Sequence, residues 1–308
     1  MQSAALKYFL EVARTGSIAE ASQRMHVAAS AISRQIAKLE DEVGAQLFER
    51  RARGMAPTPA GEVLAAHARR SRLDLDRALS EIRGQSHLRS GLVTVVTSEG
   101  FAVDIMPEAI ASFRRTYAGI RFNLLSISPA AVSRRVADGE ADIGMTFSLA
   151  PIRGTRIVRS WPAPILALMR ADHPLAGRAS LKVSEICAYP LAIPERDTTI
   201  RQLLDITLAA EALPIEPALV SNYMGALRNF SRSGGGISLT SFLSVSLRYE
   251  MEGMVLVPIS DPGMQVRRME LQTMAERTLP PAAQAFLDHL TAMIEGVLAD
   301  VVKGSGAA

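Results

Sequence analysis

The side chains best suited to chemistry in this chain of 308 residues are basic, and they lie between residues 33 and 53. Arg34 and Lys38 stand four positions apart, so on a helix they project from one face. The segment FERRARG (48–54) then places three arginines within four positions. Guanidinium and ammonium groups bind phosphate, and a guanidinium also reads the edge of guanine. The pattern predicts contact with nucleic acid, whereas Arg34 and Lys38 taken alone fit a solvated helix face equally well.

Two short helices must position these side chains. Ser17 is expected to cap the first, with Glu20 closing a capping box. The apolar face of this first helix comprises Ile18, Ala21 and Met25. After a break at 26–27, a second apolar stripe predicts a buried helix face at Ile32, Ile36, Leu39 and Val43. This second helix is predicted over 30–43 and ends at Gly44, the residue type that most often follows a helix.

This pair of helices has the form of a helix-turn-helix, whose second helix enters the major groove while the first crosses the DNA backbone. The arginine cluster that follows is typical of a wing that grips phosphates or enters a minor groove. The predicted DNA contacts are Ser30, Ser33, Arg34, Lys38, Arg51 and Arg53.

The run 6–64 resembles the N-terminal winged helix-turn-helix of LysR-type transcriptional regulators. The motifs that carry the resemblance follow one another without gaps: LKYFLEVA, GS, AISRQI, LE-x-E-x-G, LFER and TPAGE. One departure is the run Ala28-Ala29-Ser30, where the family usually has Ser-Gln-Pro. Ala28 cannot cap the second helix, so the cap either moves to Ser30 or is lost, at about 1 kcal/mol. Ala29 cannot contact adenine as glutamine does, which alters the expected base preference.

Charge and composition agree with a polyanion partner for the N-terminal part. Residues 1–90 carry 14 Lys and Arg against 10 Asp and Glu, whereas residues 91–308 carry 20 against 21. The single cysteine, Cys187, excludes an internal disulfide and is interpreted as a small core residue, with a redox sensor as the alternative. No leader-like segment and no apolar run long enough to span a membrane is found, which predicts a cytoplasmic protein without a membrane partner.

A long helix is predicted to follow the wing. Thr58 and Pro59 are typical of a helix start, and the helical pattern continues to about residue 87. Apolar and small residues recur at the heptad positions Leu64, Ala68, Ser71, Leu75, Ala78 and Ile82. A helix of this length has no obvious core to cover, which predicts a partner helix, although a lone linker helix is the alternative. The resemblance likewise implies dimerisation through this helix, and pairing of dimers into tetramers.

The remainder of the chain alternates between strands and helices, after a boundary expected at 84–91. Predicted strands are 92–97, 120–127, 142–147, 165–169, 190–193, 217–220, 237–240, 255–257 and 265–274. Predicted helices are 103–117, 130–137, 200–212, 223–231 and 281–302. We expect mostly parallel sheets with helices on both faces, hence an α/β protein. The expected domains are 1–58 for DNA binding, 59–90 for the linker and hinge, and 91–308. For the last of these the resemblance implies a two-lobed effector domain similar to periplasmic binding proteins.

Hydroxyl groups gather where predicted parallel strands end, which is where ligands bind in such sheets. The predicted effector contacts are Ser98, Ser128, Thr146, Phe147, Arg196, Thr198 and Thr199. Free N–H groups at the following helix starts favour a small carboxylate. The ordinary alternative is that the hydroxyls are helix caps and that Arg196 pairs with its neighbours Glu195 and Asp197.

The sequence offers nothing for catalysis. The five histidines share no metal-ligand spacing, and neither a nucleophile elbow nor a phosphate-binding loop is present, so no metal, cofactor or enzyme activity is predicted. The prediction is a ligand-responsive transcriptional regulator that binds double-stranded operator DNA, with RNA polymerase as a candidate partner. Its rivals are an α/β ligand-binding protein or enzyme whose N-terminal helices only dimerise it, and a sequence-indifferent DNA-binding protein.

Overall fold

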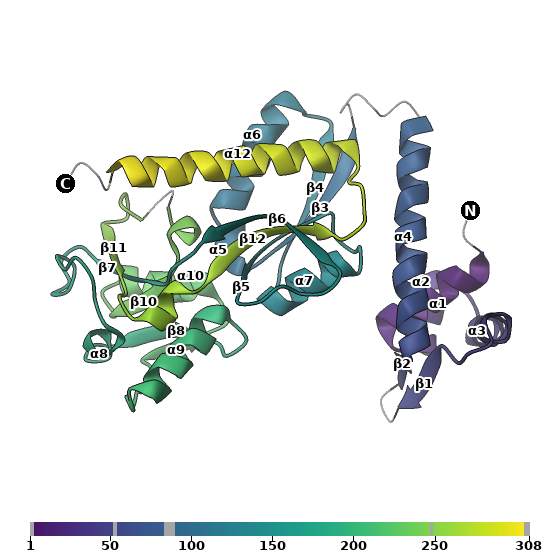
Figure 1. Ribbon diagram of the computed structural model, residues 1–308, viewed down its shortest axis with the longest axis horizontal. Helices are drawn as coiled ribbons and strands as arrows, with labels where there is room; N and C mark the ends of the chain where they lie inside the picture. The colour runs from purple at the N-terminus through teal and green to yellow at the C-terminus, as the bar shows by residue number, and fades with distance from the viewer. Residues whose placement is uncertain (1–2, 52–53, 83–89, 247–248, 305–308) are drawn as a thin grey trace. The chain divides into compact units, whose positions relative to one another are not determined.

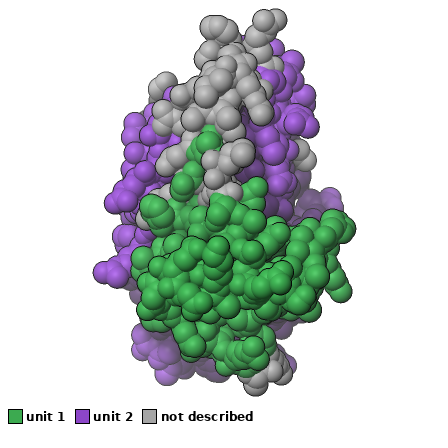
Figure 2. Space-filling view, turned by 90° about the vertical axis from the view of Figure 1, so that its right-hand side faces the viewer, with its two compact units in different colours: residues 1–86 green, residues 87–308 purple. Residues whose placement is uncertain are grey.

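The computed structural model describes residues 3–51, 54–82, 90–246 and 249–304 (Figure 1). The chain divides into two compact units, Met1–Ser86 and His87–Ala308, which Figure 2 colours separately. The expected boundary at 84–91 lies mostly outside the described residues. No helix of the described part combines the length and the apolar character needed to cross a bilayer.

The first unit contains helices and one hairpin. In chain order its elements are α1 (Ala4–Thr15), α2 (Ile18–Met25), α3 (Ala29–Val43), β1 (Phe48–Arg51), β2 (Gly54–Pro57) and α4 (Pro59–Ile82). Fully or almost fully buried side chains from these helices, from β1 and from the loop before β1 form its core, among them Phe9, Ala21, Ile32, Leu47, Phe48 and Ala68. The predicted order of helix-turn-helix, wing and long helix is therefore confirmed.

Two local predictions in this unit are wrong. The Ser17 hydroxyl does accept from the Glu20 N–H at 3.3 Å, but the Glu20 carboxylate turns to Arg24, at 3.1 Å from Nε, and does not close a capping box. The Ser17 N–H instead donates to the Thr15 hydroxyl. Val43, expected on the buried stripe, is 46% exposed because α3 ends there, past the last core residue of the helix, Leu39.

The first turns of α4 pack within the unit. The Thr58 hydroxyl accepts from the Gly61 N–H at 3.1 Å, as expected for a cap. Ala65 and Ala68 are buried against α1, so this part of the helix has a core of its own, contrary to expectation. Further along, Ser71 is exposed and Leu75 is half-buried. The side chains of Ala78 and Ile82 lie outside the described residues.

The second unit contains two five-stranded sheets, one in each lobe. The first has the order β4 (Ile120–Ser126), β3 (Gly91–Thr97), β5 (Ile143–Ser148), β12 (Arg268–Met274), β6 (Thr155–Pro162). The second has the order β11 (Met254–Pro258), β7 (Leu166–Arg170), β10 (Ile237–Thr240), β8 (Leu191–Pro194), β9 (Leu219–Ser221). In each sheet four of the five strands point the same way and one runs opposite to them, β12 in the first sheet and β7 in the second, so the expectation of mostly parallel sheets is confirmed. The two reversed strands, β7 and β12, each enter a lobe from the other lobe.

Helices cover both faces of each sheet, as predicted. The first lobe has α5 (Glu99–Ala102), α6 (Ile105–Thr116), α7 (Pro129–Ala137) and α12 (Pro281–Gly304). The second has α8 (Val183–Ile186), α9 (Thr199–Ala210), α10 (Met224–Arg232), α11 (Pro262–Gln265) and the short 3-10 helix η2 (Phe242–Ser244). In the first lobe α6 and α12 share the larger core, and α7 packs on the opposite face, beside Val96.

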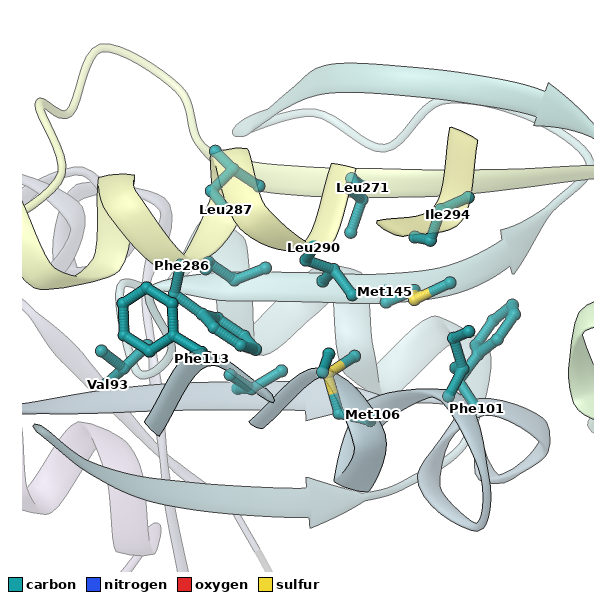
Figure 3. Packing of buried hydrophobic residues seen from close by; sticks show 14 of the residues in the cluster. Val93, Phe101, Met106, Phe113, Met145, Leu271, Phe286, Leu287, Leu290 and Ile294 are labelled. Atoms are coloured by element: carbon teal, nitrogen blue, oxygen red, sulfur yellow. The ribbon is translucent and has the colours of Figure 1, made fainter. Parts of the chain in front are cut away.

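Aromatic rings fill the centre of that larger core. The ring of Phe113 packs edge-on against Phe286 with centroids 5.4 Å apart, and the Phe122 ring centroid lies 4.6 Å from that of Phe286. In Figure 3 the rings of Phe113 and Phe286 lie beside Val93, and Leu290 of α12 points toward Met145 of β5. The C-terminal helix is thus an integral part of the first lobe, although it follows the second lobe in sequence.

Some element predictions differ from the structure. The helix expected at 103–117 is confirmed as α6, with Pro107 in its first turn, where a missing N–H is tolerated, but the short helix α5 before it was not predicted. The strand expected at 265–274 begins at Arg268, since Pro262 starts the short helix α11 before it. Strand β6 was not predicted, and its residues TRIVRSWP show no regular alternation of apolar and polar side chains that could have located it.

Candidate nucleic-acid interface and ligand cavity

The outer face of α3 presents four of the predicted DNA contacts. Because Ile32, Ile36 and Leu39 face the core, the side chains on the opposite face are exposed, namely Ser30, Ser33, Arg34 and Lys38. Within the described residues no ion pair involves Arg34, so its guanidinium is available for a phosphate or a base. Lys38 Nζ lies 3.7 Å from the Glu42 carboxylate, and both side chains are well exposed, so this pair is weak.

The start of α3 has lost its side-chain cap. Ala28 occupies the N-cap position and makes no side-chain hydrogen bond, while Ser30 lies inside the first turn. The cap therefore does not move to Ser30. The side chain of Ser30 is exposed at the helix end that enters DNA in such motifs.

The wing is a two-stranded antiparallel hairpin in which Arg51 pairs with Gly54 across the turn. Arg50 and Arg51 are exposed, and Arg51 forms an ion pair with Glu49. Arg53, the remaining predicted contact, lies outside the described residues. The hairpin thus presents guanidinium groups to solvent shortly after α3 in sequence.

A link between α3 and the wing was not predicted from the sequence. Glu40 Oε1 accepts from the backbone N–H of Leu47 at 2.8 Å and of Phe48 at 3.2 Å. One carboxylate therefore holds the first residue of β1 against the last turns of the recognition helix. The only signal in the sequence was the LE-x-E-x-G motif, which does not say which of its acids turns inward.

Glu40→Ala is expected to lower the free energy of unfolding of the first unit by about 1.5–3 kcal/mol, because two N–H groups lose a charged acceptor. The wing should also lose its position relative to α3, so affinity for DNA should fall. Urea unfolding followed by circular dichroism, together with fluorescence anisotropy on labelled DNA, measures both effects. Glu42→Ala, on the exposed face of the same helix, is the control. Equal stability of the two variants would contradict the role of Glu40.

The second unit holds a cavity of about 240 Å³ between its two lobes. We call it the interlobe cavity. Its first-lobe walls come from the carboxyl ends of β3, β4 and β5 and from the residue before β12; its second-lobe walls come from the segments after β8, β9 and β10. The helices α7, α9 and α10 all begin beside it, so three helix N-termini, the ends that carry positive partial charge, lie at the same space.

Five of the predicted effector contacts line this cavity: Ser98, Ser128, Phe147, Thr198 and Thr199. Two do not. Thr146 is buried behind Ser98, whose hydroxyl lies 2.9 Å from its own, and Arg196 is exposed outside the cavity.

Three of the lining hydroxyls stand at helix starts. The Thr198 hydroxyl caps α9 by accepting from the Arg201 N–H at 3.2 Å, which is the ordinary role of such a residue. Ser98 and Ser128 also stand at N-cap positions, but their side chains make no capping bond.

The side chain that sequence reasoning missed is Arg267. It is only 1% exposed, yet it lines the interlobe cavity. Its Nε donates to the Ala163 carbonyl at 3.0 Å, and its guanidinium carbon lies 4.1 Å from the centroid of the Phe147 ring. Its Nη2 has no hydrogen-bond partner among the described residues. Burial lowers the pKa of Arg267 to about 9, so the side chain is still a cation at neutral pH.

A carboxylate also lines the interlobe cavity. Burial raises the pKa of Glu99, while the backbone N–H groups of Met224 and Gly225 at the start of α10 act in the opposite direction. Glu99 Oε1 is buried and has no hydrogen-bond partner within the described part of the chain. The cavity lining therefore combines a buried guanidinium and a largely buried carboxyl group.

The one thiol of the chain, that of Cys187, lies away from this cavity. Cys187 packs at the edge of the second-lobe core, and burial, followed by the charges of Glu211 and Asp261, raises the pKa of its thiol. A thiol with a raised pKa is a poor nucleophile at neutral pH. Across the described residues, no group of three or more His, Cys, Asp or Glu is arranged to hold a metal ion.

A winged helix-turn-helix followed by a long helix and a two-lobed α/β unit with an interlobe cavity defines a ligand-responsive DNA-binding regulator. Family models agree in both parts: residues 3–62 match the bacterial regulatory helix-turn-helix protein of the lysR family, and residues 86–295 match the LysR substrate binding domain. The chain belongs to the LysR family of transcriptional regulators.

Relatives and solved structures extend over nearly the whole chain. The SDS degradation transcriptional activation protein of a Pseudomonas species is 29% identical over 294 residues, which cover 91% of this chain and 92% of the relative. A full-length OxyR variant from Pseudomonas aeruginosa has a TM-score of 0.67 at 21% identity, covering 94% and 93% of the two chains. Full-length CbnR complexed with its target DNA has a TM-score of 0.55 at 20% identity, covering 95% and 99%.

Proposed function

We propose that this LysR-type regulator reads its operator through Ser30, Ser33 and Arg34 on the outer face of α3. In the same proposal Lys38 and the wing arginines Arg51 and Arg53 grip the DNA backbone or minor groove. The observation that supports this most directly is the exposed face of α3, where Arg34 has no competing ion pair among the described residues. A major-groove helix needs such a face, since bidentate guanidinium contacts distinguish base pairs.

The proposed assembly is a dimer through α4, with domains at 1–58, 59–90 and 91–308. The half-buried Leu64 and Leu75 lie on its heptad seam, and a partner helix would cover them. In the same proposal two dimers pair into a tetramer, and the DNA-bound protein contacts RNA polymerase. The protein is proposed to act in the cytoplasm, where the operator DNA lies. Light scattering of the protein with and without DNA measures the assembly.

The DNA contacts can be tested on the segment upstream of the protein's own coding region, compared with random DNA at two salt concentrations. We expect a preference of about a thousandfold for the native segment. Arg34→Ala should reduce that preference by about ten- to a hundredfold, since one bidentate base contact is lost. Lys38→Ala should weaken binding to both DNAs alike. Arg121→Ala, an exposed arginine of the second unit, is the control. Equal affinity of the wild type for both DNAs would contradict the proposal.

The proposed effector is a small molecule that carries a carboxylate and binds in the interlobe cavity. The single observation that supports it best is Arg267, a buried cation whose Nη2 lacks a partner among the described residues. Leaving such a charge unpaired is costly, so a ligand anion that pairs with it gains affinity. The N-termini of α7, α9 and α10 add positive potential, and Ser98, Ser128, Thr198 and Thr199 add hydroxyls.

This proposal can be tested with carboxylic acids and their primary amides, which match in shape but differ in charge. Thermal unfolding of the full chain should shift upward with one or more acids and not with the matching amides, since only the acids pair with Arg267. Calorimetry then gives the dissociation constants. Equal shifts with acids and amides would exclude a carboxylate-specific site.

A further inference from the structure

Two side chains that line the interlobe cavity each have one buried polar atom without a hydrogen-bond partner in the described part of the chain. One is the donor Nη2 of Arg267, and the other is the acceptor Oε1 of Glu99. A buried polar atom without a partner costs about 1–3 kcal/mol, and more when the group is charged. A ligand that forms a hydrogen bond with only one of these atoms leaves the other without a partner, and the free-energy cost of that second atom remains.

The position of Glu99 is fixed by close packing between the lobes. A Cβ at the next residue, Gly100, would lie 2.5 Å from the Ser244 hydroxyl and 3.5 Å from the Phe147 ring. Residue 100 must therefore be glycine for the chain to approach the second lobe this closely. The Glu99 carboxyl group also faces the N–H groups of Met224 and Gly225; burial raises its pKa, and these N–H groups oppose that shift. Packing between the lobes thus holds the Glu99 carboxyl group at the lobe junction, beside the start of α10.

The formal charges around the cavity argue against a simple anion as the occupant. Arg267 supplies one positive charge, whereas Glu99 and the exposed Asp197 each supply a negative one. A ligand whose only charged group is a carboxylate would pair with Arg267 and add a further negative charge near Glu99. A ligand that also carries a cation would pair with both buried groups and leave the site closer to neutral.

We propose that the effector is a zwitterion of the amino-acid type, whose carboxylate pairs with Arg267 and whose ammonium group pairs with Glu99. The inference rests on the proposed carboxylate site and adds the second charge. The cavity volume of about 240 Å³ equals the space of about eight waters at about 30 Å³ each. That volume suits a molecule of amino-acid size.

The experiment uses the standard amino acids, each with two matched probes at millimolar concentration. The first probe is the same acid with hydrogen in place of the amino group, and the second is the amino acid amide. Thermal unfolding and calorimetry are measured on the full chain, on Glu99→Gln and on Arg267→Met. Glu195→Gln, an exposed acid on the loop before α9 that does not line the cavity, is the control. Glutamine keeps an acceptor for the N–H groups of α10, so Glu99→Gln should fold.

The expected result is that at least one amino acid binds the wild type about ten- to a hundredfold more tightly than its deamino acid. Glu99→Gln should abolish this preference while the deamino acid keeps its affinity. If the deamino acid binds the wild type as tightly as the amino acid, or no amino acid binds, the zwitterion inference is overturned. If acids bind but Arg267→Met leaves their affinity unchanged, the carboxylate site itself is wrong. The two proposals therefore fail in different ways.

Discussion

Arg267→Met is expected to weaken binding of carboxylate effectors by about 30-fold or more without unfolding the effector unit. Removing one partner of a buried, hydrogen-bonded charge pair costs about 2 kcal/mol or more, which corresponds to that factor. Methionine is unbranched and adaptable in shape, so it fills the space beside Phe147. The variant should no longer respond to effector in DNA-binding assays, because a ligand shifts an equilibrium only through its differential affinity.

The stability of the ligand-free variant separates this explanation from a general loss of structure. The bond from Nε to the Ala163 carbonyl is worth about 1 kcal/mol, whereas relief of a buried, unpaired charge offsets or exceeds that loss. The free energy of unfolding should therefore stay equal or rise. Arg268→Met is the matched control: its exposed side chain bonds Ser160 at 2.7 Å and lies one residue further along the chain. If both variants bind carboxylates like the wild type, Arg267 does not contact the effector.

Gly61→Ala is expected to lower the free energy of unfolding of the DNA-binding unit by about 3 kcal/mol, at the upper end for overpacking. Helix propensity by itself favours alanine over glycine by about 1 kcal/mol. Whether Gly61→Ala stabilises or destabilises the unit therefore depends on whether the added Cβ has room. A Cβ here would overlap the carbonyl oxygen of Leu47, which already accepts from the Thr58 N–H at 3.0 Å. Because that oxygen belongs to the backbone beside the wing, it cannot move aside cheaply, and DNA binding should be lost as well. Urea unfolding and anisotropy on labelled DNA measure the two effects.

Gly296→Ala, the same substitution at another helical glycine, is expected to stabilise the protein, in contrast to Gly61→Ala. Gly296 lies in α12, and nothing lies within 4 Å of the position that an alanine Cβ would take there, so alanine should stabilise the effector unit by about 1 kcal/mol. The single tryptophan, Trp161, belongs to that unit, so its fluorescence reports Gly296→Ala, whereas circular dichroism also follows the helices of the first unit. If both substitutions raise the free energy of unfolding, the contact with the Leu47 carbonyl oxygen does not determine the effect of Gly61→Ala.

The sequence by itself determined the elements whose signals are local. Periodicity located α2, α3 and the long helix, and residue types located the wing and the turn at Gly44. The same logic brought Ser98, Ser128 and Thr198 to one cavity, because parallel strands place their carboxyl ends together. Such patterns can be recognised because helix and strand periods repeat every few residues.

Tertiary structure alone decided which charges are buried and what they face. Arg267 and Arg268 are adjacent arginines in the sequence, yet one is 1% exposed and the other lies on the surface. Strand β12 joins the first lobe only after the chain has completed the second, and this return carries Arg267 to Phe147, far earlier in the sequence. Arg196, beside a helix start, is exposed instead. A contact over that sequence separation depends on the packing of both lobes, which no local pattern contains.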